Sequence, residues 1–156
     1  MVRTPLRILV LCGGNSAERA VSLESGQCTA DSLSRCGHHV RLLDPANQFT
    51  DTDLLQADIV VPMLHGLGGE DGSLQRRLQQ LKVPWLGSSP EASALTFSKT
   101  RTRHLLQSLS LPVAAGAAVR RNDSTHQICQ TAAGIGFPLV VDRKSTRLNS
   151  SHEFVS

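Results

Sequence analysis

The chain has 156 residues, enough for one domain or for one domain and part of another. It is 40% hydrophobic but only 3% aromatic, so its core must be aliphatic, and a net charge of +3 with few stacking rings argues against nucleic-acid binding. The longest early apolar run, Ile8 to Cys12, is too short for a signal peptide or a membrane span, which predicts a cytoplasmic protein without a membrane partner.

Strand and helix patterns alternate along the first half of the chain. An apolar strand is expected from Leu6 to Cys12, and Gly13 and Gly14 end it. A helix follows and stops at Gly37. Its expected inward face consists of Leu23, Gly26, Ala30 and Leu33. Further strands are expected at His39 to Leu43, Asp58 to Pro62 and Pro84 to Leu86. A helix with Leu74, Leu78 and Leu81 on its inward face is expected before the last of these strands.

The second half begins with a polar break near Ser88 to Pro90. A basic helix from Lys99 to Leu109, an extended segment, a helix capped by Asp123 or Ser124 and a buried strand from Phe137 to Val141 then follow. The four cysteines form no C-x-x-C pair, and three lie on expected core elements. They are therefore expected to pack as small apolar side chains, and neither a zinc site nor a disulfide framework is expected.

Strands separated by single helices favour an α/β fold, with a Rossmann-like parallel sheet covered on both faces. In such sheets the working loops lie at the carboxyl ends of the strands. Two glycine-rich loops fall there, GGNSAER after the first strand and HGLGGEDG after the third. The two loops should therefore face the same crevice.

The loop GGNSAER supports two readings. Glu18 could hold a substrate ammonium group, or it could supply first-turn charge for the helix that follows. The loop lacks the second glycine of the dinucleotide fingerprint. A nucleotide-binding module that uses Gly13, Gly14 and Asp44 is still an alternative, although an aspartate before proline also starts turns.

The loop HGLGGEDG is more specific, because its four glycines cost backbone entropy that a simple connection would not require. His65 can donate a hydrogen bond or titrate near neutral pH, and we expect it to approach Glu18. Glu70 and Asp71 could cap the next helix. Lys99 could bind phosphate as a point charge, or it could belong to a solvated basic face.

ILVLCGGNSAERAVSLESG and LHGLGGEDGSLQ resemble the amino-terminal part of D-alanine–D-alanine ligases. GSSPEASALTFSKTRTRHLL, LPV and GFPLVV follow in that family's order, so the resemblance covers Arg7 to Val141. Four positions differ from the residues usual in the family, namely Arg76, Ser89, Phe97 and Ser98.

The resemblance implies an ATP-grasp ligase that uses ATP and Mg²⁺. ATP phosphorylates one D-alanine, and the amine of a second D-alanine then attacks to give a dipeptide for bacterial peptidoglycan. It implies a pre-ATP-grasp domain over residues 1–96, the incomplete start of the ATP-grasp domain over 97–141, and a homodimer in the full-length family. It assigns Glu18 and His65 to catalysis and D-alanine binding, Glu70 to substrate binding and Lys99 to ATP. The metal ligands are expected to be absent from this chain. Ligases that join D-alanine to D-lactate or D-serine, and a stand-alone binding domain, remain alternatives.

The last residues depart from this pattern. The segment from Asp142 to His152, DRKSTRLNSSH, resembles a translated sequencing-library adapter, so residues 142–156 are interpreted as a non-native tail. The tail has few large apolar side chains, so we expect it to form no packed structure. We also expect no ligase activity from the chain as written, because no phosphate-covering loop or carboxylate cluster follows Val141.

Overall fold

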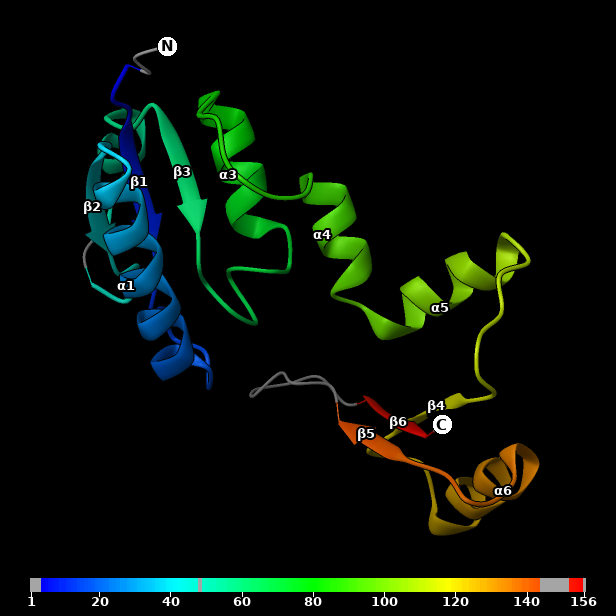
Figure 1. Ribbon diagram of the computed structural model, residues 1–156. Helices are drawn as coiled ribbons and strands as arrows, with labels where there is room; N and C mark the ends of the chain where they lie inside the picture. Colours follow the sequence, from blue (N-terminus) through cyan, green and yellow to red (C-terminus); the bar gives the residue numbers. More distant parts are fainter. Residues whose placement is uncertain (1–3, 48, 144–151, 156) are drawn as a thin grey trace. The chain divides into compact units, whose positions relative to one another are not determined.

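The computed structural model describes residues 4–47, 49–143 and 152–155, which form two compact units divided between Phe97 and Ser98 (Figure 1). The first unit contains β1 (Arg7–Leu11), α1 (Arg19–Arg35), β2 (His39–Leu43), α2 (Asp51–Leu55), β3 (Ile59–Pro62), α3 (Ser73–Leu81) and α4 (Pro90–Thr96). The second unit contains α5 (Lys99–Ser108), β4 (Ala117–Arg120), α6 (Thr125–Ile135), β5 (Val141–Arg143) and β6 (His152–Val155).

The first unit is built on a parallel sheet with the strand order β2-β1-β3. Ile8 lies opposite Val40 on one side and Ile59 on the other. The segment expected as a fourth strand adds a single parallel bridge, from Trp85 to Val60. The predicted α/β fold with a parallel sheet is confirmed.

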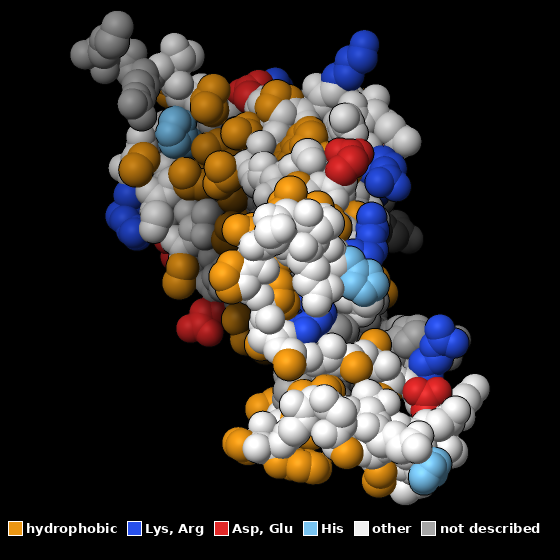
Figure 2. Space-filling model, turned by 90° about the vertical axis from the view of Figure 1, so that its right-hand side faces the viewer, with side chains coloured by type: hydrophobic (Ala, Val, Ile, Leu, Met, Phe, Trp, Pro, Cys, Tyr) orange, Lys and Arg blue, Asp and Glu red, His pale blue; other side chains and the backbone are white. Residues whose placement is uncertain are grey.

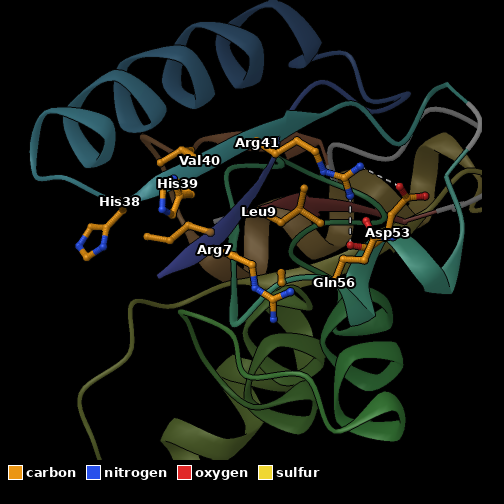
Figure 3. A pocket seen from close by; sticks show the side chains of 10 residues that line it. Arg7, Leu9, His38, His39, Val40, Arg41, Asp53 and Gln56 are labelled. Atoms are coloured by element: carbon orange, nitrogen blue, oxygen red, sulfur yellow. Dashed lines mark hydrogen bonds and ion pairs between the residues drawn. The ribbon is translucent and has the colours of Figure 1, made fainter. Parts of the chain in front are cut away.

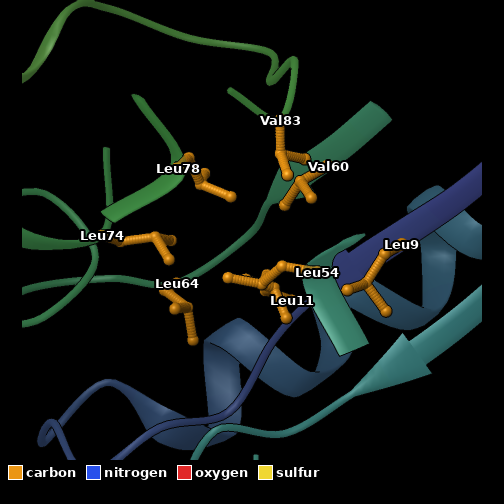
Figure 4. Close-up of a cluster of buried hydrophobic side chains, with 8 residues drawn as sticks. All are labelled: Leu9, Leu11, Leu54, Val60, Leu64, Leu74, Leu78 and Val83. Atoms are coloured by element: carbon orange, nitrogen blue, oxygen red, sulfur yellow. The ribbon is translucent and has the colours of Figure 1, made fainter. Parts of the chain in front are cut away.

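The central strand β1 sends alternate side chains to the two faces of the sheet, as the two-residue period of a strand requires. Leu9 and Leu11 join a cluster that α2 and α3 cover (Figure 4). The other members of this cluster are Leu54, Val60, Leu64, Leu74, Leu78 and Val83. Ile8 and Val10 face the opposite way and pack with Ala30 of α1. The sheet is therefore covered on both faces.

The buried face of α1 differs from the expected one by one position. Ser22, Gly26 and Ala30 face inward, whereas Leu23 is 38% exposed. Small residues at four-residue steps allow the helix to lie close to β1. A Cβ on Gly26 would come within 2.3 Å of Cys12 Cβ. The close packing of α1 against β1 thus outweighs the burial of Leu23.

Two helices of the first unit were not predicted from the sequence. The short helix α2 begins with a capping box, in which Asp53 accepts a hydrogen bond from the Thr50 backbone N–H at 3.0 Å. The segment interpreted as a break instead starts α4, where Ser89 Oγ accepts from Ala92 N at 3.2 Å and Pro90 opens the helix. Both starts carry recognisable capping residues.

The second unit has an antiparallel sheet with the order β4-β6-β5. Its helix α6 begins after Ser124, which forms a capping box with Gln127. Ser124 is one of the two residues predicted to cap this helix. The buried strand predicted from Phe137 to Val141 is wrong, because Phe137 is 78% exposed and β5 starts only at Val141. An apolar run is buried only where further layers cover it.

We expected residues 142–156 to form no packed structure, but two described parts of this segment lie in strands, in β5 and in β6. The strand β6 pairs through its backbone with β4 on one side and β5 on the other. Backbone pairing needs no apolar side chain, and β4 would otherwise present an unpaired edge. Residues 144–151 and 156 of the expected tail lie outside the described residues.

The cysteines also depart from expectation, since Cys12 is buried but Cys28, Cys36 and Cys129 are exposed. Apolar side chains also reach the surface at scattered positions (Figure 2). Examples are Val21, Leu55, Leu67 and Leu86. Of the helices in the described ranges, none is both long and apolar enough to cross a membrane.

Candidate functional site

The two glycine-rich loops touch one another at the carboxyl edge of the parallel sheet. A Cβ on Gly14 would lie 3.3 Å from Leu64 Cδ2, so the first loop rests on the start of the second. A Cβ on Gly66 would lie 3.3 Å from Ser16 Cβ and 3.6 Å from Glu18 Oε2. The Glu18 carboxylate therefore lies beside the residue that follows His65.

Glu18 is exposed and immediately precedes α1. Its side chain makes no capping hydrogen bond within the described part of the chain. Glu18 is nevertheless the N-cap residue of α1, so the alternative role as a charge at the helix amino terminus, which needs no such bond, still stands. Its backbone N–H donates to Ser16 Oγ at 3.2 Å, which shapes the turn before the helix. The carboxylate is left on the surface at the junction of the two loops.

Asp44 holds the first loop in place. Its Oδ1 accepts from Gly14 N at 2.8 Å, and its Oδ2 lies 2.5 Å from an Arg19 guanidinium nitrogen. The same guanidinium donates to Gly14 O at 3.0 Å. The hydrogen bond from Arg19, aided by the Gly14 and Ala46 N–H groups, lowers the pKa of Asp44 to about 2. The carboxylate is thus engaged within the loop, and this does not favour the nucleotide-binding alternative.

The lowered pKa of Asp44 predicts a loss of stability in acid. A carboxyl with a folded pKa of about 2 and a usual value of 3.8 stabilises the fold fully above pH 3.8, and this contribution is lost as the pH falls towards 2. Between pH 6 and pH 3 we expect a loss of up to about 1 kcal/mol, a figure reduced for the partly exposed Arg19. Urea unfolding at pH 6 and pH 3 measures it.

Asp44→Asn is the comparison for this prediction. Other carboxyls with lowered pKa, such as Asp53, Asp58 and Asp71, titrate in the same acid range. The variant keeps their contribution and removes that of Asp44, so its stability should fall less between pH 6 and pH 3. An equal loss in both proteins would contradict the assigned role of Asp44.

Asp71 caps α3 and closes the second loop. Its Oδ1 accepts from Ser73 N at 3.0 Å and from Ser73 Oγ at 2.6 Å, and its Oδ2 accepts from Gly68 N at 3.1 Å. Burial acts to raise the pKa of Asp71, but the hydrogen bonds from Ser73 and Gly68 outweigh it and lower the pKa. The expected capping role therefore holds for this residue.

Glu70 faces its own loop. One carboxylate oxygen accepts from Gly66 N at 2.9 Å, and the other lies 3.7 Å from Nδ1 of His65. The Nε2 atom of His65 is buried and has no hydrogen-bond partner among the described residues. Glu70 thus supports the loop that carries His65.

Two buried polar residues behind the loops were missed from the sequence. Ser22 is fully buried and bonds to Gly13 of the first loop and to Met63, just before the second. Gln75 is 6% exposed and donates from Nε2 to Gly69 O at 2.7 Å. The only feature of the sequence that could have identified these two residues is a polar side chain at a buried position of a helix.

Lys99 is the first residue of α5 and belongs to the second unit. Its expected contact with ATP phosphates stays a prediction. Across residues 4–47, 49–143 and 152–155 no group of three or more His, Cys, Asp and Glu side chains is placed to hold a metal ion. The described residues therefore do not fit a magnesium site.

An open cavity of about 570 Å³ lies away from the loops, at the amino ends of β1 and β2 (Figure 3). Arg7 and Arg41 line it, and both are already paired. Arg7 lies 2.6 Å from Asp58, and Arg41 lies 3.0 Å from Asp53. The paired charges and the distance from Glu18 and His65 along the strands make this cavity a weaker candidate than the loops.

The fold is that of an α/β protein with a parallel sheet, a class in which ligands bind at the carboxyl ends of the strands. No family model matches the chain. The chain is 36% identical over 135 residues to the D-alanine–D-alanine ligase of Acinetobacter baumannii, a match that covers 86% of the chain and 42% of the relative. It is 41% identical over 135 residues to the ligase of Alcanivorax borkumensis, covering 86% of the chain and 41% of the relative.

Solved structures agree with these sequence relatives. The D-alanyl-alanine synthetase A of Vibrio cholerae matches with a TM-score of 0.80 at 25% identity, over 98% of this chain and 52% of that one. The ATP complex of the Bacillus anthracis D-alanine–D-alanine ligase shares the fold, with a TM-score of 0.77 at 23% identity, over 96% of this chain and 57% of that one. The chain is therefore a homologue of the D-alanine–D-alanine ligases, which confirms the resemblance. It spans about two fifths of the length of the curated relatives it matches.

Proposed function

We propose that this chain supplies the D-alanine-binding loops of an ATP-dependent D-alanine–D-alanine ligase. The observation that carries the proposal is the position of Glu18, whose carboxylate lies 3.6 Å from the Cβ site of Gly66, directly after His65. A carboxylate and an imidazole at the junction of two loops can take the two charged ends of a zwitterionic amino acid. The relatives named as D-alanine–D-alanine ligases support that substrate.

Each residue of the proposed subsite has a distinct task. Glu18 accepts hydrogen bonds from the ammonium group of D-alanine, since an ionised acceptor strengthens such bonds. His65, whose side chain is 33% exposed, donates to the substrate carboxylate. Glu70 holds the Gly66 N–H and keeps the His65 loop in place. Glu18 and His65 thereby orient the substrate.

The remaining parts of the proposal rest on the names of the relatives and on the family resemblance of the sequence. The B. anthracis ligase solved with ATP supports ATP as the second ligand. Lys99 is proposed as a phosphate contact from the family resemblance of its sequence. Mg²⁺, a homodimeric assembly, a cytoplasmic location and a role in peptidoglycan synthesis belong to this proposal as well. The names of the relatives favour D-alanine over D-lactate or D-serine as the second substrate.

The test is a titration of the ¹⁵N-labelled chain with D-alanine, followed by NMR. We expect D-alanine to shift the amide signals of Glu18 and Gly66 more than L-alanine does. Glu18→Gln should weaken binding about tenfold, or about 1.4 kcal/mol, because it removes the charge that faces the ammonium group. Glu24→Gln is the matched control, since Glu24 is an exposed carboxylate on the same helix.

Equal binding by the Glu18→Gln variant, or D-alanine shifts confined to other parts of the chain, would refute the subsite. A separate assay with ATP, Mg²⁺ and D-alanine should detect no phosphate release above a no-protein control. Acyl-phosphate formation needs metal neutralisation of the transferring phosphoryl group, for which the described residues assemble no ligand set.

A further inference from the structure

Ser22 occupies an unusual place for a serine on a helix. It is 0% exposed, and its Oγ accepts from Gly13 N at 2.8 Å and donates to Met63 O at 2.6 Å. Gly13 opens the first loop, and Met63 precedes His65 by two residues. One buried hydroxyl therefore bridges the roots of both loops.

This bridge stands at a defined point of the strand ladder. The parallel pairing of β1 with β3 sets Leu11 opposite Pro62, and Met63 N donates to Leu11 O at 2.7 Å. In a regular parallel ladder the next hydrogen bond would run from Gly13 N to Met63 O. The Ser22 hydroxyl lies between these two groups and bonds to both. The hydroxyl thus replaces a ladder bond and holds the two strands apart where the loops begin.

The position of the Ser22 hydroxyl also affects the proposed D-alanine subsite. Glu18 and His65 extend from the two backbones that Ser22 separates, so the width of this insertion sets the spacing of the carboxylate and the imidazole. We infer that Ser22 is a positioning residue, whose hydroxyl sets the separation of the two loops and thereby their fit to D-alanine. The inference about D-alanine rests on the proposed function, whereas the coupling of the loops does not.

The experiment compares ¹⁵N-labelled Ser22→Ala with the full unchanged chain. Loss of the hydroxyl either lets Gly13 N reach Met63 O directly or leaves both groups unpaired, and each result moves the second loop. We expect shifted amide signals at His65 and Gly66 with an unchanged far-ultraviolet circular dichroism spectrum. D-alanine binding should weaken about tenfold.

Two further variants separate positioning from general destabilisation. Ser22→Cys is nearly isosteric, and its thiol donates and accepts only weakly, so its shifts and affinity should be intermediate. Ser32→Ala is the matched control on the same helix, because the Ser32 hydroxyl bonds to other residues of that helix. It donates to Cys28 O at 2.8 Å and accepts from an Arg35 guanidinium nitrogen at 3.0 Å. The Ser32→Ala variant should leave the His65 and Gly66 signals and D-alanine binding unchanged.

The outcomes distinguish the two proposals. If the unchanged chain binds no D-alanine, the proposed function fails, and the His65 and Gly66 signals alone decide the role of Ser22. If Ser22→Ala leaves those signals where they were, the inference is overturned whether or not D-alanine binds. The same holds if Ser32→Ala moves them equally.

Discussion

Gly13→Ala is expected to destabilise the first unit by about 3 kcal/mol. Gly13 has a φ of +91°, where an L side chain costs about 1–2 kcal/mol. A Cβ there would also lie 2.6 Å from Cγ of Asp44, so the carboxylate must move away from Gly14 and Arg19. Overpacking of this kind costs about 1–3 kcal/mol. Urea unfolding followed by the fluorescence of Trp85, the single tryptophan, measures the loss within the first unit.

Gly37→Ala is the control that separates the cost of backbone strain from the cost of the contact between the new Cβ and Asp44. Gly37 has a similar φ of +87°, but a Cβ there would meet no described atom within 4 Å. It should therefore show the backbone cost alone, about 1–2 kcal/mol. Gly13→Ala should in addition raise the pKa of Asp44, which NMR titration of its carboxyl detects. Equal losses in the two variants would show that Asp44 does not restrict this position.

Gly26→Ala is expected to cost about 1–2 kcal/mol, although alanine is the better helix former. The new Cβ would lie 2.3 Å from Cys12 Cβ and 2.6 Å from Cys12 Sγ. Cys12 is 4% exposed at the end of the central strand, so it has little room to move. Overpacking by about 1–3 kcal/mol or more exceeds the gain of about 1 kcal/mol in helix propensity. The same fluorescence-detected urea unfolding measures the result.

Gly134→Ala is the matched control, because Gly134 also lies within a helix and a Cβ there would meet nothing within 4 Å among the described atoms. This variant should be neutral or stabilising by up to about 1 kcal/mol, and circular dichroism reports it for α6. A stabilising Gly26→Ala would mean that α1 can move away from β1, contrary to the packing described above.

Local patterns carried most of the fold prediction. The apolar runs of β1 and β3, the alternation in β2 and the leucine spacing of α3 each depend on residues within a few positions of one another, so periodicity identifies them. The helices α2 and α4 were missed although Thr50 and Ser89 are recognisable caps. The exposed Phe137 was mispredicted because a run of apolar residues does not reveal whether other layers cover it.

The sequence by itself determined the parallel α/β architecture, the two glycine-rich loops and the family resemblance, because these follow from short-range patterns and motifs. The tertiary structure decided which side chains meet. It turned Ser22 inward in place of Leu23, engaged Asp44 with Arg19, and brought Glu18 to Gly66. Such contacts join residues far apart in the chain, and they depend on the strand order β2-β1-β3 and on how closely α1 approaches the sheet. Neither quantity is encoded in a local period, so only the folded chain fixes the geometry of the proposed subsite.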